Sequence, residues 1–186
     1  MAAVFAVSFA NAQDSKGGSS DMKFGVKAGL NNSNYTGDAD TDAATSFYIG
    51  GLVDFTVSEK FHVQPELLYS RQGSEADTLK IKVDYISIPL MVKYYLSEKF
   101  SVEAGPQMSF LVNNKVEYDK AEWNNSIFAD RETNASSFDF GLNIGFGYNI
   151  TSNLFAQVRY NYGITTVAEN PDIKNSVFQF SLGYKL

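Results

Sequence analysis

The stretch Ser137–Ile150, SFDFGLNIGFGYNI, decides the fold. Its apolar and aromatic residues occupy every second position, and the positions between them hold Asp, Asn and Gly. Successive side chains of a β-strand point to opposite faces, so as a strand this stretch has one continuous oily face and one face that is polar or bare. The pattern therefore predicts an amphipathic strand.

The same alternation recurs in eight stretches, which are the strands that we expect. They are Lys23–Asn31, Phe47–Val57, Phe61–Arg71, Ile86–Leu96, Phe100–Asn113, Phe138–Ile150, Leu154–Thr165 and Val177–Leu186. Short and long connections alternate between them: the short ones are Ser58–Lys60, Ser97–Lys99 and Thr151–Asn153, and the long ones are Asn32–Ser46, Gln72–Tyr85, Asn114–Ser137 and Thr166–Ser176. This rhythm is typical of a transmembrane up-and-down barrel with both termini at the short-turn end. We predict an all-β fold, an eight-stranded antiparallel barrel with periplasmic termini.

The distribution of charge indicates which strand face meets lipid. One face is apolar and carries a single charge, Arg71, near a loop-side end, whereas the other carries nine charges, among them Lys23 at the rim. A charge turned towards hydrocarbon costs about 2–4 kcal/mol near the bilayer midplane, and nine of them would outweigh the net stability of a domain. The polar face is therefore expected to line the lumen. A soluble lipocalin-like barrel would show the inverse arrangement.

The lumen of an eight-stranded barrel is just wide enough for side chains to fill it. The charges inside are therefore expected to pair across it, since an unpaired buried charge is costly. This lumen charge network comprises Lys27, Asp54, Glu66, Lys93, Glu103, Asp139, Arg159 and Lys185. A packed polar core is the favoured interpretation, and a conducting or proton-relaying path is the alternative.

Composition narrows the classes of function. The chain has no Cys, so neither disulfides nor thiolate metal sites are available. The net charge of −6 disfavours nucleic acid as a partner, because phosphate neutralisation needs a basic surface. The single His, His62, follows the Ser58–Lys60 turn and would lie at the periplasmic end. There it cannot serve catalysis at the outer leaflet, and we expect a hydrated interface residue and no catalytic group.

The acidic residues of the first long connection have a spacing that begins like a calcium loop. Asp38, Asp40 and Asp42 alternate, but Ala43 stands where such a loop needs Gly and Ile49 where it needs Glu. We interpret the segment as a solvated acidic loop. The sequence thus predicts no metal site and no cofactor.

The N-terminus indicates export. Residues 2–10 are apolar with small side chains, and Ala10-Asn11-Ala12 matches the pattern at which a signal peptidase cuts. We expect residues 1–12 to be the remnant of a signal peptide, residues 13–22 a flexible leader and residues 23–186 the barrel domain.

Three prolines fit the barrel least well. Pro65, Pro89 and Pro106 lie inside expected strands, where each removes a donor from the ladder. A bulge or a weakened seam between these strands is one interpretation, and the change of phase near Tyr85-Ile86 also suggests a bulge. A seam that lets a lipid or peptide pass laterally is the sharper hypothesis.

Aromatic residues near the strand ends predict two interfacial belts. The turn-side belt comprises Phe61, Tyr94, Tyr95, Phe100, Tyr148 and Tyr184, and the loop-side belt Phe47, Tyr69, Phe110, Phe138, Tyr162 and Phe178. The longest connection adds Trp123, Ile127 and Phe128. These three could form a contact patch for a surface ligand, or pack on the barrel rim or neighbouring lipid, which is the favoured role.

The chain resembles the PorT-like outer-membrane β-barrel family of Bacteroidetes-type bacteria. The resemblance rests on Gln64–Gly73 (QPELLYSRQG), on Tyr85–Leu90 (YISIPL) followed by Lys93-Tyr94-Tyr95, and on Ala104-Gly105-Pro106. It spans residues 23–186 and implies an outer-membrane location and an eight-stranded barrel. The namesake is associated with secretion of proteases across the outer membrane, while the motifs identify no reaction. The final Leu186 departs from the usual aromatic assembly signal.

Together these features predict a non-enzymatic barrel with a plugged polar lumen and long acidic surface loops, in a structural or surface-binding role. An accessory factor in protein secretion or envelope assembly is the alternative, and a small-solute channel is a weaker one. The expected partners are outer-membrane lipid and lipopolysaccharide, the barrel-insertion machinery, and a surface ligand or secretion component.

Overall fold

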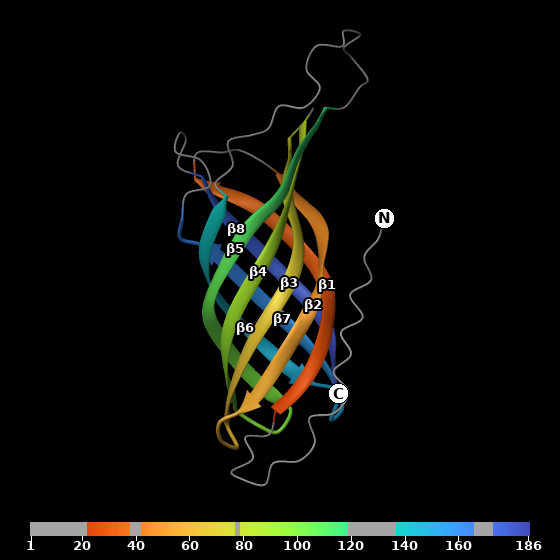
Figure 1. Cartoon of the computed structure of the whole chain (residues 1–186), viewed down its shortest axis with the longest axis vertical. Coiled ribbons are helices and arrows are strands. Elements are labelled where there is room, and N and C mark those ends of the chain that lie inside the picture. Colours follow the sequence, from red (N-terminus) through yellow and green to blue (C-terminus); the bar gives the residue numbers. More distant parts are fainter. Residues whose placement is uncertain (1–21, 38–41, 77–78, 119–136, 166–172) are drawn as a thin grey trace.

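A computed structural model shows a closed antiparallel barrel of eight strands, each hydrogen-bonded to its neighbours in sequence and the last to the first (Figure 1). It describes residues 22–37, 42–76, 79–118, 137–165 and 173–186. The strands are β1 (Met22–Gly37), β2 (Asp42–Thr56), β3 (Phe61–Ala76), β4 (Leu79–Tyr95), β5 (Phe100–Tyr118), β6 (Phe138–Asn149), β7 (Leu154–Gly163) and β8 (Ile173–Lys185). The predicted fold class and strand count are confirmed. Among the described residues there is no helix long and apolar enough to cross a bilayer.

The three short turns share one geometry. In the turn between β2 and β3, Val57 N and Ser58 N donate to Phe61 O at 2.9 and 3.0 Å, and Phe61 N donates back to Ser58 Oγ at 3.2 Å. The turns that begin at Ser97 and Thr151 repeat these bonds with their own hydroxyls. A Ser or Thr at this position therefore closes each turn by bonding the backbone, as such residues commonly do in turns.

The first strand of the barrel begins, and the last strand ends, at the short-turn end. Leu186 N donates to Phe24 O at 2.7 Å, and Lys185 N donates to Asn153 O, in the turn between β6 and β7, at 2.8 Å. The start of β1 and the end of β8 thus lie beside this turn.

The strands at the opposite end are longer than the alternation predicts. The expected long connection Gln72–Tyr85 is mostly ladder, because the pairing of β3 with β4 continues to Ala76 and Leu79. The β4–β5 pairing likewise continues to Tyr118, so β3, β4 and β5 rise beyond the rest of the rim (Figure 1). The expectation of a loop was wrong here because it took the end of the apolar alternation as the end of the strand. Backbone hydrogen bonds can continue a ladder through polar sequence as well.

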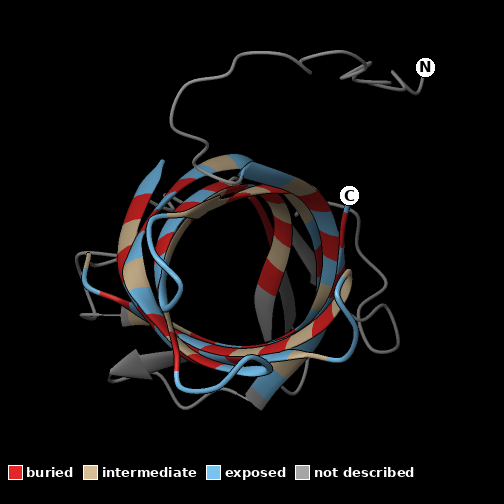
Figure 2. Ribbon diagram, turned by 90° about the horizontal axis from the view of Figure 1, so that it is seen from below, coloured by how far each residue is buried: buried red, intermediate tan, exposed pale blue. Residues whose placement is uncertain are grey.

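The faces of the strands are as predicted. Buried and exposed residues alternate around the ring of the barrel (Figure 2). The outer wall exposes large apolar side chains such as Phe47, Phe61 and Phe178, and the interior buries polar and charged ones. Tyr95 is the exception in the predicted belts. It is only 7% exposed, and its ring lies in the lumen, 4.7 Å from the ring of His62.

The prolines interrupt the ladders without shifting them. The β4–β5 register passes from Pro89↔Gln107 to Val92↔Ala104, and Leu90 and Pro106, which lie opposite one another, form no ladder pair. Similar gaps occur beside Pro65 in the β2–β3 ladder and beside Pro89 in the β3–β4 ladder. The residue count is equal on both sides of each gap, so no bulge lies at the prolines.

A register shift does occur where the sequence suggested one. Asp84 pairs with Asn113 and Tyr85 with Leu111, which leaves Val112 as the extra residue of β5. Because of this shift Val83, Asp84 and Tyr85 are all buried in succession. Asp84, expected in a loop, lies instead in β4 beside Arg71.

Some sequence-based expectations lie outside the described residues. They are the signal-peptide remnant and most of the leader, the Asp38 and Asp40 positions of the acidic loop, and the Trp123, Ile127 and Phe128 patch.

Candidate functional site in the barrel lumen

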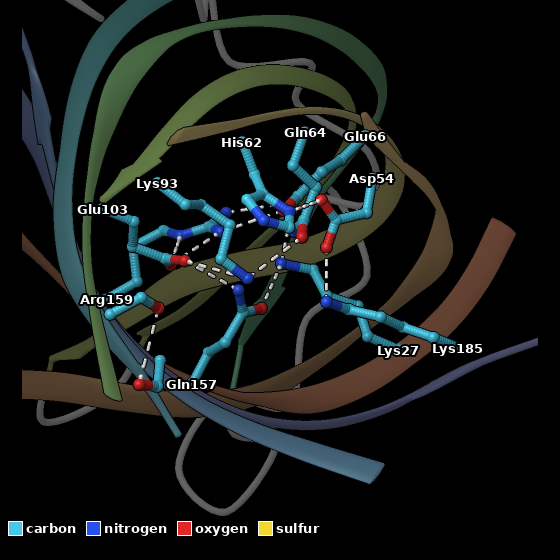
Figure 3. Close-up of polar contacts among 12 residues, drawn as sticks. Lys27, Asp54, His62, Gln64, Glu66, Lys93, Glu103, Gln157, Arg159 and Lys185 are labelled. Carbon is cyan, nitrogen blue, oxygen red and sulfur yellow. Dashed lines mark hydrogen bonds and ion pairs between the residues drawn. The ribbon is translucent and has the colours of Figure 1, made fainter. Parts of the chain in front are cut away.

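The lumen is divided into two layers of polar side chains. A charged layer occupies the half near the short turns, and a neutral layer of amides and hydroxyls occupies the half towards the opposite rim. Inward positions of all eight strands supply them, because every second residue of a barrel strand points inside. Figure 3 shows the charged layer, with its side chains converging from opposite sides of the wall.

Arg159 of β7 is the centre of the charged layer. Its Nη1 and Nη2 donate to the two oxygens of Glu66 at 3.0 and 2.9 Å. Its Nε and Nη2 also donate to Glu103 Oε1 at 3.1 and 3.0 Å. The guanidinium thus bridges β7, β3 and β5 through geometry that only Arg can provide. Its side chain is 1% exposed and both carboxylates are fully covered.

Room for Arg159 comes from the glycine beside it. Gly145 pairs with Arg159 in the β6–β7 register. A Cβ at Gly145 would lie 2.4 Å from Val158 O, closer than real Cβ atoms lie, and 3.0 Å from Arg159 Cα, which is a tight contact. The glycines on the polar face of the strands therefore allow close packing in the lumen.

Lys27 of β1 and Lys93 of β4 extend the charged layer to two further strands. Lys27 Nζ lies 2.7 Å from Glu66 Oε2 and donates to Gln157 Oε1 at 3.2 Å. Lys93 Nζ donates to Gln64 Oε1 at 3.2 Å and is 4.0 Å from the nearer Glu103 oxygen. Lys93 is thus held more by an amide than by a carboxylate.

A second group of charges lies nearest to the short turns. Asp54 Oδ2 accepts a hydrogen bond from Lys185 Nζ, and Asp54 Oδ1 lies 2.7 Å from His62 Nδ1. His62 therefore contacts a carboxylate of the lumen. The sequence-based expectation of a hydrated interface residue did not include this contact. Phe155 completes this end, with Lys93 Nζ and Lys185 Nζ at 5.6 and 5.4 Å from its ring centroid.

Asp139 stands apart from the other charges. Its two oxygens accept hydrogen bonds from Thr165 Oγ1 at 2.6 Å and from Asn175 Nδ2 at 3.0 Å. Among the described residues it has no cationic partner within 4.0 Å. The expectation that all eight lumen charges pair is therefore wrong for Asp139, because it lies at the rim opposite the charged layer.

The neutral layer consists of side chains that bond one another. Asn161 Nδ2 donates to Asn143 Oδ1 at 3.0 Å, and Asn143 Nδ2 donates to Gln107 Oε1 at 3.3 Å. On the other side of the lumen, Gln179 Nε2 donates to Asn31 Oδ1 at 2.9 Å and Asn31 Nδ2 to Ser70 Oγ at 3.0 Å. These bonds satisfy most of the polar groups of the layer, as buried polar groups require, but Gln179 Oε1 has no partner among the described residues.

The structure brings together seven of the eight candidate residues and adds others that the charge pattern could not reveal. The added residues are His62, Gln64, Gln157 and the rings of Tyr48, Tyr95 and Phe155. Their inward phase was the available signal. The layer contains four cations, Lys27, Lys93, Arg159 and Lys185, against three carboxylates, Asp54, Glu66 and Glu103. In the described part of the chain no group of His, Asp or Glu is arranged to hold a metal ion.

Bacterial surface proteins are among the solved structures on which the chain superposes. The chain superposes on Ail, the attachment invasion locus protein of Yersinia pestis, with a TM-score of 0.51 and 13% identity, over 88% of this chain and 98% of that one. A structure of Ail in complex with the heparin analogue sucrose octasulfate gives 0.51 and 14%, over 89% and 99%. Neisserial surface protein A gives 0.57 and 14%, over 88% and 97%. At this identity the similarity concerns the fold.

No curated protein sequence matches the chain significantly. The family model described as "Outer membrane protein beta-barrel domain" matches residues 11–169, which is most of the sequence. Together with the closed eight-stranded barrel and its apolar outer wall, this match establishes that the chain belongs to the outer membrane protein beta-barrel domain family and lies in the outer membrane.

Proposed function

We propose that this chain is a non-enzymatic surface-binding barrel whose lumen is plugged and whose long-loop end engages a partner outside the cell. The observation that carries the proposal is the charged layer, in which Arg159, Glu66 and Glu103 close the lumen with mutual hydrogen bonds. A lumen filled in this way leaves the ends of the barrel as its working surfaces. The loop end is taken to face outwards and the termini to be periplasmic, as in other barrels of this class.

The chemistry of the partner follows from the charge of the connections. The four connections at the loop end, residues 38–41, 77–78, 119–136 and 166–172, hold nine acidic and two basic residues, whereas the three short turns hold two of each sign. The acidity of the whole chain is thus concentrated at one end. The sulfated ligand bound to Ail is an anion. An acidic end repels such a ligand and favours a cationic one.

A binding experiment tests this assignment. The barrel in nanodiscs is expected to bind polylysine with an affinity that falls as salt rises, and to leave heparin unbound. The variant Asp38→Asn, Asp40→Asn, Asp42→Asn is expected to bind polylysine more weakly, while Glu59→Gln, Glu98→Gln at the short turns serves as the control. Heparin binding, or equal loss in both variants, would contradict the proposal.

The orientation is tested separately, and the absence of Cys makes the test clean. A Cys introduced at the exposed loop-end Ser137 is expected to react with a membrane-impermeant maleimide on whole cells. A Cys at the exposed turn residue Ser58 is expected to react only after lysis. The reverse pattern would overturn the orientation.

An accessory role in secretion or envelope assembly is the second candidate. It is favoured by the PorT-like motifs and by the ladder gaps that accompany their prolines, Pro65, Pro89 and Pro106. Co-purification in mild detergent of a secretion component that remains bound after the acidic-loop substitutions would favour this role. A small-solute channel is disfavoured by the filled lumen.

A further inference from the structure

The seam between β1 and β8 differs from the other strand pairs of the described barrel, because its two strands are not consecutive in sequence. In the other pairs a connection limits how far one strand can slide along its neighbour. At the seam, a slide of one residue would turn every side chain to the other face, but a slide of two residues preserves both faces. Something else must therefore fix the register there, and with it the stagger of the closed ring.

The outer face of the seam does not distinguish between these registers. In the native register Val26 lies opposite Tyr184 and Ala28 opposite Leu182. A slide of β8 by two residues towards the loop end would place Tyr184 opposite Ala28, and a slide towards the short turns would place it opposite Phe24. Apolar side chains face apolar side chains in all three registers. The outer wall therefore gives the native register little advantage.

The inner face of the seam does distinguish between them. In the native register Lys185 lies opposite Gly25, and the neighbouring inward positions of β1 are Lys23 and Lys27. The slide towards the loop end would place Lys185 opposite Lys27, and the slide towards the short turns would place it opposite Lys23. Like charges directly opposite one another destabilise a strand pair, and more strongly where water is scarce. Both slides are therefore penalised by a pair of lysines.

The native register also gives Lys185 its acidic partner. Gly25 has no side chain in this row, and Lys185 Nζ donates to Asp54 Oδ2 of β2, on the far side of β1 (Figure 3). The two side chains are 7% and 2% exposed, so loss of either partner would leave a buried charge unpaired. The slide towards the loop end would move Lys185 about 7 Å away along the strand. The opposite slide would put Lys23, the register partner of Asp54, between the two.

The polar contacts of the lumen depend on the same register. Lys27 Nζ of β1 donates to Gln157 Oε1 of β7 at 3.2 Å, and Gln179 Nε2 of β8 donates to Asn31 Oδ1 of β1 at 2.9 Å. Both hydrogen bonds cross the seam. A slide of two residues would displace their partners by about 7 Å and break them. The register of the seam thus decides whether the charged and neutral layers assemble.

We propose that Lys185, Gly25 and Asp54, the closing contact, select the register in which β8 joins β1 when the barrel closes. Attraction to Asp54 favours the native register, and repulsion from Lys23 and Lys27 disfavours both slides of two residues. The closing contact acts in the assembly of the lumen and not in the binding of a partner. It rests neither on the proposed surface-binding function nor on the proposed orientation.

Disulfide cross-linking of the full barrel in lipid vesicles tests the proposal, since the chain has no Cys of its own. Tyr184→Cys is combined with Val26→Cys to report the native register, with Ala28→Cys to report the slide towards the loop end, and with Phe24→Cys to report the slide towards the short turns. Directly opposite residues lie within reach of a disulfide, whereas residues displaced by two lie about 7–8 Å apart. With the closing contact intact, only the native pair is expected to cross-link.

Substitution of Lys185 in the three Cys pairs measures what the contact does. Lys185→Met removes the attraction to Asp54 and the repulsion between lysines. It is expected to raise the ratio of slipped to native cross-links at least about tenfold, because a buried ion pair that loses one partner costs more than a factor of ten in population. Lys185→Arg keeps the charge and is expected to keep the native register. Lys60→Met, at an exposed turn, is the matched control.

Two double variants separate register selection from stability, and cross-links are scored only in the folded, heat-modifiable band. Asp54→Asn, Lys185→Met leaves neither charge unpaired and is expected to slip even if the single variant fails to fold. The charge swap Asp54→Lys, Lys185→Glu keeps an ion pair but attracts position 185 to Lys23 and Lys27, so it is also expected to slip. An ion pair that only stabilises the barrel would be rescued by the swap. Native cross-links alone in the neutral variants or in the swap would overturn the proposal, as would equal slipping of Lys185→Arg and Lys185→Met.

Discussion

Arg159 shows how one residue can connect three strands across the lumen of a barrel. Its guanidinium satisfies Glu66 and Glu103 at once, and these two carboxylates also take Lys27 and Gln157. Burial of charges is expensive, and the cost is offset only where each charge has both a partner and hydrogen bonds. The charged layer meets this condition most fully around Arg159 and least fully around Lys93.

Replacement of Arg159 by Met is expected to lower the free energy of unfolding by about 3–5 kcal/mol, because it leaves two buried carboxylates without their main partner. Urea unfolding of the barrel in lipid vesicles, followed by the heat-modifiable gel shift, measures the change. Lys60→Met, at an exposed turn, is expected to change the stability by less than about 0.5 kcal/mol. Similar values for the two variants would show that Arg159 is dispensable.

Two lumen glycines differ in what lies opposite them. A Cβ at Gly183 would lie 2.1 Å from Phe155 Cζ, the far end of a side chain, whereas a Cβ at Gly145 would meet the backbone oxygen of Val158. Gly145→Ala is therefore expected to lower the free energy of unfolding by about 1–3 kcal/mol, because no side-chain movement can relieve a clash with the backbone. Gly183→Ala is expected to be rescued by Phe155→Leu. A double-mutant cycle measured by urea unfolding would show positive coupling for Gly183 with Phe155, and additivity would refute the steric explanation.

At the scale of the elements, the strands from β2 to β5 differ from those that follow them. The ladder gaps at Pro65, Pro89 and Pro106 lie on consecutive strand pairs, whereas the β5–β6, β6–β7 and β7–β8 pairings run without a gap. Each proline removes a donor in a closed wall that has no free edge. The interior beside the gaps is filled by Glu66, Lys93 and Glu103, which opposes lateral passage of a lipid into the lumen.

Amides beside the gaps are expected to exchange hydrogen faster than amides at similar depth in β6 and β7. Pro106→Ala supplies the missing donor opposite Leu90 and is expected to raise the stability by about 0.5–1.5 kcal/mol. Hydrogen exchange with mass spectrometry measures both effects. Uniform protection across β2–β7 would contradict the idea of a weakened seam.

At the scale of the whole molecule, the barrel separates two surfaces. Its outer wall is apolar between the rims, its described interior buries polar and charged side chains, and the acidic residues of the connections belong mainly to those at the loop end. We expect that these side chains leave ions no continuous aqueous path. Function is therefore expected at the ends of the barrel.

Planar bilayer recordings are expected to show no steady pore conductance for the wild-type barrel. The triple variant Glu66→Ala, Glu103→Ala, Arg159→Ala removes the centre of the charged layer together with its mutual charges. It is expected to conduct, because the emptied space can hold water. Equal conductance of the two proteins would refute the plug.

The sequence by itself determined the barrel, its strand count and its two faces. The reason is that an alternation with a period of two indicates to which strand face each residue belongs. The free-energy cost of a charge in hydrocarbon then indicates which face is inside. The alternation thereby assigned Phe140 to the outer face and Asp139 to the lumen before any strand pairing was known. The same reasoning named Lys27, Glu66, Glu103 and Arg159 as residues of the lumen.

Only the tertiary structure decided which of these residues meet. The stagger of the strands sets the height of each side chain, so it brought Arg159 to Glu66 across the lumen and left Asp139 with Thr165 and Asn175. It also extended β3, β4 and β5 beyond their oily stretches and placed Asp84 beside Arg71. Pairing register and ladder length depend on hydrogen bonds between strands distant in sequence, and a pattern within one strand contains no information about them.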